Sequence, residues 1–281
     1  MKKGLVLSRS ARQTIHAPVR PLAESHAVTC TGLVLSDPAN CALFLDLDGT
    51  LLNLATTPKG VEVPAGLIDL LDGLYVALGG AVAIVTGRHI ADVDRLLQPL
   101  RLPASGVHGS ELRVSAESDV AVLTGAIPST MFAQISEMTR SIPGAFTESK
   151  ETALTVHYRL APEAEQQIAQ QLSELLARHA GQFRLVPGRK VFEILPAGLS
   201  KGTALRMLAA MPQFSGRTPI MIGDDVGDEP AFEASQALSG HGLRVAGEHF
   251  SIDFAAFQGP SEVRIWLAEL LEVVRCKEVD V

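Results

Sequence analysis

The chain has 281 residues, of which 47% are hydrophobic and 20% are charged, and its formal net charge is −7 at pH 7. This excess of acidic residues argues against nucleic acids and anionic membrane surfaces as partners, because both attract concentrated Lys and Arg. The length exceeds that of one average domain and predicts a core with an accessory domain.

The N-terminal region, residues 1–38, mixes Arg, His, Pro and Ser without periodicity, and we interpret it as an arm outside the main fold. Its apolar run Gly4–Leu7 is too short for the hydrophobic part of a secretory signal. No stretch reaches the roughly 18 apolar residues of a membrane span. The three widely spaced cysteines show no metal-ligand pattern and favour a reducing compartment. These features predict a soluble, cytoplasmic protein.

Short apolar runs that end in polar residues mark the strands of a parallel sheet. Residues 41–45 form the first such run and residues 81–85 the second. A continuous apolar run bounded by a turn signal fits a strand that is buried on both faces. Residues 65–78 carry apolar positions at helical spacing, and a second helix is expected over 90–97. The alternation of strand and helix predicts an α/β domain with a parallel sheet.

The pattern changes after about residue 112, where strand-like pieces surround two helical stretches. This arrangement predicts an α+β insertion with antiparallel strands, after which the parallel-sheet pattern returns. The expected elements of the insertion are strands over 120–123, 152–158, 183–186 and 190–195 and helices over 129–141 and 162–179. The expected elements after it are helix 201–211, strand 219–222 and helix 261–274. We therefore expect residues 39–113 and 198–281 to form the core and residues 114–197 to form the inserted domain.

The most informative residues are Asp46-Leu47-Asp48-Gly49-Thr50, directly after the first predicted strand. Side chains two residues apart in an extended segment point the same way, and the ligand crevice of an open parallel sheet lies beyond the carboxyl ends of its strands. Two carboxylates placed together there repel each other, so the pair needs raised pKa values or a cation. The alternative interpretation is an ordinary acidic turn, since Asp-Gly is a common turn dipeptide.

A second acidic cluster, with Asp224, Asp225 and Asp228, follows another predicted strand. Alone it would be a solvated loop, but two acidic clusters at the ends of two core strands should face one crevice. Hard oxygen ligands suit Mg²⁺, which binds few carboxylates and keeps its waters for a substrate phosphate. Thr86 at a strand end and Lys201 at a helix start can both meet a phosphate. Singly, such residues are more often a turn threonine and a surface lysine.

The order of these elements resembles the haloacid dehalogenase superfamily of phosphotransferases. The residues that carry this resemblance are, in order, Asp46-x-Asp48-Gly49-Thr50, Thr86, Lys201 and Gly223-Asp224-Asp225. Within the superfamily the sequence is similar to the trehalose-6-phosphate phosphatase family over about residues 42–270, although Gly227 stands where that family carries Thr. The segments behind the narrower resemblance are Gly106-Val107-His108-Gly109-Ser110-Glu111, Leu154-Thr155-Val156-His157-Tyr158-Arg159, Gly188-Arg189-Lys190-Val191-Phe192-Glu193-Ile194-Leu195-Pro196 and Gly223-Asp224-Asp225-Val226-Gly227-Asp228-Glu229.

The resemblance implies a Rossmann-like parallel-sheet core with an inserted α+β cap domain that acts as a lid. It also implies hydrolysis of a small phosphorylated sugar through an aspartyl-phosphate on Asp46, with Asp48 as the acid and then the base. Thr86 and Lys201 would hold the phosphoryl oxygens. The expected cofactor is Mg²⁺, and its expected ligands are Asp46, the Asp48 main-chain carbonyl and Asp224, with Asp225 or Asp228 orienting coordinated water.

The resemblance further implies that Lys190 and Glu193 reach the sugar hydroxyls. Residues three apart on a strand should point to opposite faces unless a bulge intervenes, which argues against a shared contact. His157 and Arg159 alternate on one strand face and fit a structural role equally well. The predicted substrate-binding residues are Arg88, His108, Glu111, His157, Arg159, Lys190 and Glu193.

Other functions stay open on the sequence. A phosphatase for sucrose 6-phosphate or a mannosylglycerate phosphate would use the same core, and a phosphomutase would share the nucleophile but return the phosphoryl group to its product. A non-catalytic sugar-phosphate sensor has no need of both a nucleophile and an acid, so the pair Asp46 and Asp48 argues against it. The resemblance also implies a trehalose-6-phosphate synthase of the same pathway as a partner.

Overall fold

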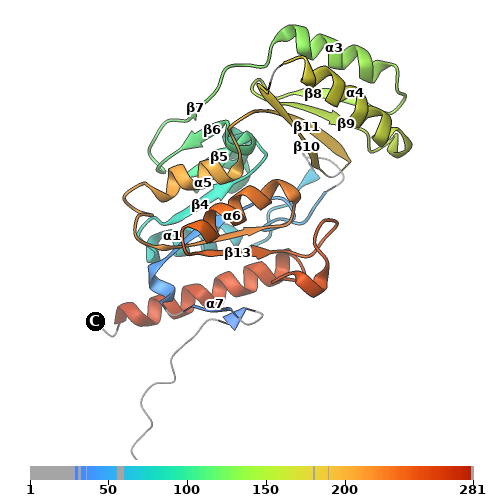
Figure 1. Ribbon diagram of the computed structural model, residues 1–281. Coiled ribbons are helices and arrows are strands. Elements are labelled where there is room, and N and C mark those ends of the chain that lie inside the picture. The colour runs from blue at the N-terminus through green and yellow to red at the C-terminus, as the bar shows by residue number, and fades with distance from the viewer. Residues whose placement is uncertain are drawn as a thin grey trace, which may run out of the picture.

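The computed structural model describes residues 29–30, 33–35, 37–55, 60–179, 181–188 and 190–279. Residues 1–28, which make up most of the predicted arm, and Arg189 of the segment 188–196 lie outside the described residues. A larger sheet below and a smaller sheet above organise the described part of the chain (Figure 1). The predicted α/β fold class with an inserted α+β region is confirmed by this arrangement.

The larger sheet has, among the described residues, the strand order β13-β12-β3-β4-β5-β6-β7. The strands from β13 to β5 are parallel, whereas β6 and β7 are antiparallel additions at one edge. The chain runs from β3 outward to β4 and β5, then returns to β12 on the other side of β3. Such a switch of direction opens a ligand crevice at the carboxyl ends of the two strands. The strands are β3 (Cys41–Leu45), β4 (Val82–Val85), β5 (Ala104–Gly106), β6 (Glu111–Arg113), β7 (Ala121–Val122), β12 (Thr218–Gly223) and β13 (His241–Arg244).

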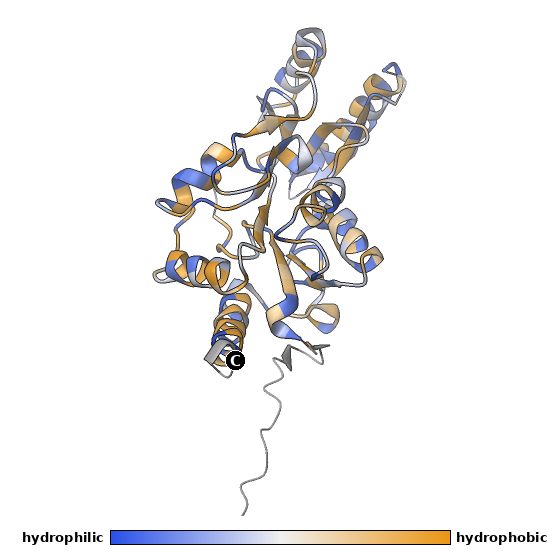
Figure 2. Cartoon of the chain, turned by 90° about the vertical axis from the view of Figure 1, so that its left-hand side faces the viewer, coloured by the Kyte–Doolittle hydropathy of each residue, from blue (hydrophilic) through white to orange (hydrophobic). Residues whose placement is uncertain are grey.

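Helices flank this sheet, and two close contacts fix their packing. A Cβ on Gly73 would lie 2.9 Å from a methyl carbon of Leu271, and a Cβ on Gly202 would lie 2.1 Å from the Pro230 carbonyl oxygen. Glycine therefore allows α1 to approach α7 and α5 to approach α6. Hydrophobic residues run along the central strands (Figure 2). The helices are α1 (Leu67–Ala77), α2 (Ile90–Leu97), α5 (Lys201–Ala209), α6 (Glu229–Ala237) and α7 (Pro260–Val279).

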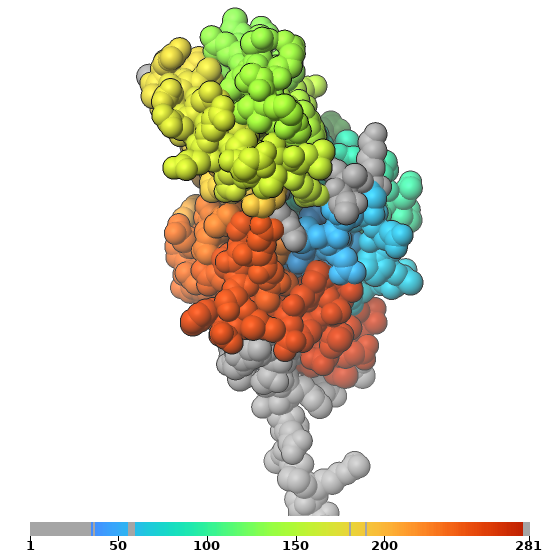
Figure 3. Space-filling view, turned by 90° about the vertical axis from the view of Figure 1, so that its right-hand side faces the viewer, coloured from blue at the N-terminus to red at the C-terminus, as the bar shows by residue number. Residues whose placement is uncertain are grey.

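The smaller sheet is antiparallel, with the order β10-β11-β9-β8. Its apolar cluster, which includes Met131, Ile135 and Ile168, is separate from that of the larger sheet. Figure 3 shows this green-to-yellow region seated on the rest of the molecule. Its elements are α3 (Ser129–Arg140), β8 (Phe146–Ser149), β9 (Leu154–His157), α4 (Glu165–Ala177), β10 (Phe183–Gly188) and β11 (Val191–Pro196).

Short elements complete the description. The strands β1 (Thr29–Cys30) and β2 (Leu33–Val34) pair with each other. Within the part of the chain that the structure describes, every helix is too short or too polar to cross a membrane. The 3-10 turns are η1 (Pro38–Asn40), η3 (Val107–Gly109), η4 (Pro162–Ala164), η5 (Val226–Asp228) and η6 (Ile252–Phe254).

One predicted strand joins the other sheet. The run over 120–123 was expected in the insertion, but β7 pairs with β6 through Glu111 and Val122 at the edge of the larger sheet. An apolar run indicates a strand but does not identify its partner, which depends on non-local contacts. We propose that the inserted cap begins after β7, and the separate apolar clusters support a division of the remaining chain into a core and a cap.

Candidate active site

The two predicted acidic clusters meet at the carboxyl ends of β3 and β12. Asp46 follows β3 directly, and its main-chain N–H donates to the Ile222 carbonyl of β12 at 2.9 Å. Asp224 follows the last residue of β12. The Asp46 side chain is almost completely buried, at 4% exposure. The parallel pairing of β3 and β12 therefore brings together carboxylates that lie far apart in the sequence.

Lys201 lies between two of these carboxylates. Its Nζ donates to Asp46 Oδ1 at 2.7 Å and to Asp228 Oδ1 at 2.6 Å. Ser200 caps α5 in a reciprocal capping box with Thr203, which fixes the start of the helix and hence the lysine. Burial opposes the charge of Lys201, but the charges of Asp228 and Asp46 raise its pKa above the ordinary lysine value. Lys201 is therefore a buried ammonium that offsets the nearby negative charge.

Asp228 organises the acidic loop from within. Its side chain is completely buried, and Oδ2 accepts hydrogen bonds from the main-chain N–H groups of Asp224 at 3.1 Å and Asp225 at 3.0 Å. The Asp225 carboxylate instead accepts from Val226 N–H at 2.7 Å and lies 3.1 Å from His249 Nε2. The loop thus turns Asp224 and Asp228 toward Asp46, whereas the Asp225 carboxylate points toward His249.

The carboxylates of Asp46, Asp224 and Asp228 fit a divalent cation. Ligand oxygens of the three residues lie within 4.8 Å of one another. Burial, with the charge of Asp228 next, raises the pKa of Asp224 to about 7. Burial also raises the pKa of Asp46 well above its ordinary value, against the opposing effect of Lys201. One ammonium therefore leaves the cluster short of positive charge, and buried hard oxygens of this kind accept a small divalent metal ion.

Gly49 gives the first test of this geometry. Its φ is +81°, and a Cβ there would lie 2.0 Å from Asp224 Oδ2. We expect Gly49→Ala to push the Asp224 carboxylate aside and to lower the catalytic activity of the site on the order of 10²-fold, the effect of a misplacement near 1 Å. Gly66→Ala is the matched control, because Gly66 has a φ of +80° and nothing within 4 Å of the added Cβ. Both variants should lose about 1–2 kcal/mol of stability from backbone strain, and equal activity in the two would contradict the role of Asp224.

Arg88 binds the carboxylate of Asp48. Its Nε and Nη2 lie 2.5 and 2.6 Å from the two carboxylate oxygens of Asp48, a bidentate pair. The Arg88 main-chain N–H donates to Thr86 Oγ1 at 3.2 Å, so the loop after β4 orders both residues. The predicted contact of Arg88 with substrate stays a prediction; in this structure its guanidinium holds Asp48.

Glu193 of the cap reaches the core. Its Oε2 lies 2.6 Å from His108 Nε2, and its Oε1 lies 3.3 Å from Lys150 Nζ. Lys150 also donates to the Gly87 carbonyl at 3.2 Å, one residue from Thr86. Lys150, which follows β8 in a charged turn, was not among the residues predicted from the sequence. The alternation of Glu148 and Lys150 on one side of an extended segment was the available signal.

The remaining predicted cap residues lie apart from Glu193. Lys190 sits between β10 and β11 with a φ of +57°, and its Nζ lies 3.4 Å from Glu165 Oε2. His157 Nε2 lies 2.8 Å from Glu148 Oε2. Arg159 is exposed. Lys190 precedes β11, whereas Glu193 lies within it, so the alternation of side chains along a strand does not apply to this pair, and the roles of both residues toward a sugar stay predictions.

Glu111 contacts the start of α2. Its Oε2 accepts from the Ile90 main-chain N–H at 2.8 Å, and its Oε1 lies 2.7 Å from His89 Nδ1. A carboxylate at a helix N-terminus is stabilised by the helix dipole and the open N–H groups. Both oxygens of Glu111 therefore have partners within the core, and its predicted contact with substrate is untested.

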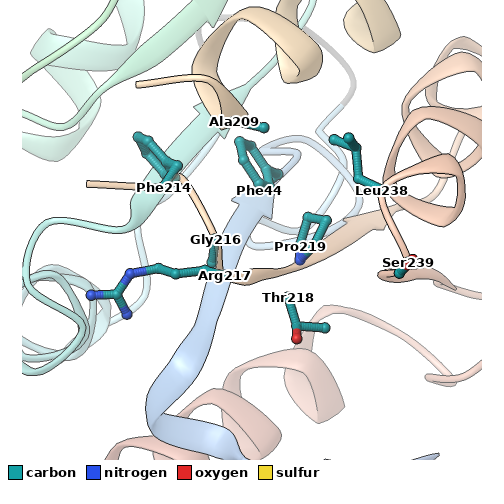
Figure 4. Close-up of a pocket in the computed structure, with 10 residues that line it drawn as sticks. Phe44, Ala209, Phe214, Gly216, Arg217, Thr218, Pro219, Leu238 and Ser239 are labelled. Carbon is teal, nitrogen blue, oxygen red and sulfur yellow. The ribbon is translucent and has the colours of Figure 1, made fainter. Parts of the chain in front are cut away.

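A pocket on the other side of the molecule takes no part in this chemistry (Figure 4). It lies where β3 and β12 begin, whereas Asp46 and Asp224 lie where these strands end. Its charged residue, Arg217, donates to the carbonyl oxygens of Ala39 and Cys41 at 3.1 and 3.4 Å. The lining residues are Ala42, Phe44, Ala209, Phe214, Gly216, Arg217, Thr218, Pro219, Leu238 and Ser239.

Comparison with known proteins gives consistent results. The family described as trehalose-phosphatase matches residues 44–264. A probable trehalose-phosphate phosphatase of Sinorhizobium fredii is 40% identical over 75% of this chain and 79% of its own length. A trehalose-6-phosphate phosphatase of Escherichia coli is 36% identical over 74% of this chain and 78% of its own. The solved C-terminal domain of the C. albicans trehalose-6-phosphate phosphatase shares the fold, with a TM-score of 0.73 at 19% identity over 84% of this chain and 93% of that one.

Proposed function

The chain belongs to the trehalose-phosphatase family, and from this premise we propose that it hydrolyses trehalose 6-phosphate to trehalose and inorganic phosphate. The observation that carries the proposal is the buried contact of Lys201 with Asp46 and Asp228, next to Asp224. Burial of a lysine between carboxylates removes water from both charges, so it is not expected in an ordinary solvated acidic loop. It is expected in a site that binds a phosphoryl group and a metal ion.

In the proposed first step, an Asp46 oxygen attacks phosphorus, a bond from that oxygen to phosphorus forms, and the bond from phosphorus to the sugar oxygen breaks. Asp48 gives its proton to the departing sugar oxygen. In the second step, Asp48 takes a proton from water, the water oxygen attacks phosphorus, and the bond to Asp46 breaks to release phosphate. Thr86 and Lys201 hold phosphoryl oxygens, and Arg88 orients Asp48 between the two proton transfers.

We propose Mg²⁺ as the metal ion, held by Asp46 and Asp224 with the Asp48 main-chain carbonyl. When bound, it supplies positive charge next to the phosphoryl oxygens. Asp228 fixes the loop of Asp224 through two main-chain N–H groups, and Asp225 is proposed to orient solvent at the rim. The pKa of Asp224, raised to about 7 chiefly by burial, supports a cation at this position.

Phosphate release from a panel of sugar phosphates tests the proposal. Trehalose 6-phosphate should be hydrolysed with Mg²⁺, activity should disappear with a chelator, and added Mg²⁺ should restore it. Preferred hydrolysis of sucrose 6-phosphate or a mannosylglycerate phosphate would reassign the sugar and leave the chemistry intact. An isomerised sugar phosphate in place of free phosphate would indicate a phosphomutase.

Glu193 is proposed to contact the sugar, with Lys150 next to it. We expect Glu193→Ala to lower kcat/KM for trehalose 6-phosphate by about ten- to hundred-fold, because hydrogen bonds to a charged group are lost. Hydrolysis of p-nitrophenyl phosphate, which contains no sugar, should change little. Equal losses on both substrates, measured under the same conditions, would count against a sugar contact.

The cellular setting is also a proposal. We infer a cytoplasmic location, which the free thiols of Cys41 and Cys276 support. A trehalose-6-phosphate synthase, which would supply the proposed substrate, is the proposed pathway partner. Co-purification of the two enzymes from native cells would test a physical contact between them.

A further inference from the structure

A buried polar contact crosses from the core to the cap and has no part in the proposed bond changes. His108 in η3 of the core places Nε2 at 2.6 Å from Glu193 Oε2, and the two side chains are only 11% and 10% exposed. Lys150 lies at the other oxygen of Glu193 and also donates to the Gly87 carbonyl of the core. We refer to His108, Lys150 and Glu193 as the cap–core junction.

The core holds His108 in an unusual backbone conformation. Its φ is +52°, a left-handed value that costs free energy for a residue other than glycine. The imidazole packs against Gly87 and Gly227. A Cβ added to Gly87 would lie 2.3 Å from Nε2, and a Cβ added to Gly227 would lie 3.7 Å from Nδ1. The His108 main-chain N–H donates to the Thr86 carbonyl at 3.2 Å. The imidazole is therefore set between the loop of Thr86 and the acidic loop.

The same two segments also make an apolar contact. Val107, Ala153 and Leu195 form a small buried cluster. Val107 precedes His108, and Leu195 lies two residues beyond Glu193, so it points to the same side of β11. This apolar cluster lies next to the buried contacts of Glu193. Together they define one position of the cap on the core, because a shift of the cap would expose the cluster and break these contacts.

Glu193 is held in a fixed, charged state at this junction. Burial opposes its ionisation, but the charges of His108 and Lys150 hold the pKa of this carboxyl well below its ordinary value. Each carboxylate oxygen has its own partner. The carboxylate is therefore oriented before any sugar arrives, which lowers the entropy cost of binding.

We infer that His108 is a positioning residue, which fixes the Glu193 carboxylate of the cap beside the catalytic loops and thereby sets the preference for a sugar phosphate over phosphate esters too small to reach the cap. The inference rests on the proposed function, because it takes Glu193 as the sugar contact. His108 acts through Glu193 and touches no phosphoryl oxygen, so its loss should spare the hydrolysis of small esters.

Asn and Gln at position 108 differ in how far their side chains extend toward Glu193. Asn tolerates left-handed backbone, but its amide nitrogen extends only to the position of Nδ1, whereas the amide nitrogen of Gln extends to that of Nε2. We expect His108→Asn to lower kcat/KM for trehalose 6-phosphate by about ten- to hundred-fold, mainly through KM. His108→Gln should recover most of the loss. Both should hydrolyse p-nitrophenyl phosphate within about twofold of wild type, as should the control His179→Asn, a change in the cap away from the junction.

A double-mutant cycle shows whether the effect passes through Glu193. In a Glu193→Gln background, His108→Asn should cause little further loss, because the group that it positions is already altered. Independent, multiplying losses would overturn the inference, as would equal losses on both substrates or no recovery in His108→Gln.

Hydrogen exchange in the absence of substrate provides a test that does not depend on the sugar. Exchange of the amides of residues 107–110 should be faster in His108→Asn than in wild type and unchanged in His108→Gln, because the cap is held less firmly when the side chain at this position does not reach Glu193. Unchanged exchange in His108→Asn would overturn the inference. If the wild type hydrolyses p-nitrophenyl phosphate but not trehalose 6-phosphate, the proposed substrate fails, and this measurement still decides the role of His108.

Discussion

Asp46→Asn should lower phosphate release on the order of 10⁴-fold or more, because the amide cannot form the aspartyl-phosphate that divides the reaction into two steps. The variant should fold normally. Asn has the shape of Asp, and its carbonyl oxygen can still accept the hydrogen bond from Lys201 Nζ, which lies 2.7 Å from Asp46 Oδ1. It also removes one buried negative charge from a residue whose pKa is raised well above the ordinary value by burial.

Rapid-quench trapping of labelled phosphate on the protein is the decisive measurement. Wild type should carry the label during turnover, and Asp46→Asn should not. Asp92→Asn is the matched control, because Asp92 pairs with Arg95 on the exposed side of α2. Label on the Asn variant, or turnover near the wild-type rate, would show that another residue is the nucleophile.

Lys201→Met should lower both activity and stability. It removes the ammonium that contacts Asp46 and Asp228 and leaves two buried carboxylates without their cation. Removal of one partner from a buried ion pair costs about 3–5 kcal/mol. The loss of a group that stabilises charge on the phosphoryl oxygens should lower kcat by on the order of 10²–10³-fold.

Denaturant unfolding of the wild type and the variant, with and without Mg²⁺, measures the change in the free energy of unfolding. Lys277→Met is the matched control, since Lys277 pairs with Asp37 on the surface, where the side chains are 47% and 59% exposed. That change should alter the free energy of unfolding by less than about 1 kcal/mol. Equal stability changes in the two variants would contradict the buried ion-pair network. A bound metal ion should offset part of the loss in Lys201→Met, because it supplies positive charge to the same carboxylates.

The different positions of Asp225 and Asp228 could not be predicted from the sequence. Asp225 and Asp228 were equally plausible partners for coordinated water. In the structure Asp228 is completely buried and contacts Lys201, whereas Asp225 lies at the rim near His249. The direction of each side chain depends on the turn η5 and on contacts with α5, which no local pattern encodes.

Several elements were missed for a related reason. The short strands β5, β6 and β8, the strand β13 and the helix α6 were not predicted. β8 is mostly exposed and β13 only partly buried, so neither shows the continuous apolar run that revealed β3 and β4. Their strand character comes from hydrogen bonds to neighbouring strands.

The sequence was enough to predict which residues gather at one edge of the core sheet. Asp46, Thr86 and Asp224 each follow an apolar run, and parallel strands carry such residues to one edge of a sheet, so local order was enough to place them together. Tertiary structure alone decided which groups hold these residues. It paired Lys201 with Asp46 and Asp228, and it joined Glu193 of the cap to His108 of the core. These are contacts between segments far apart in the chain, and side-chain partners at that distance follow from packing, which a local pattern does not contain.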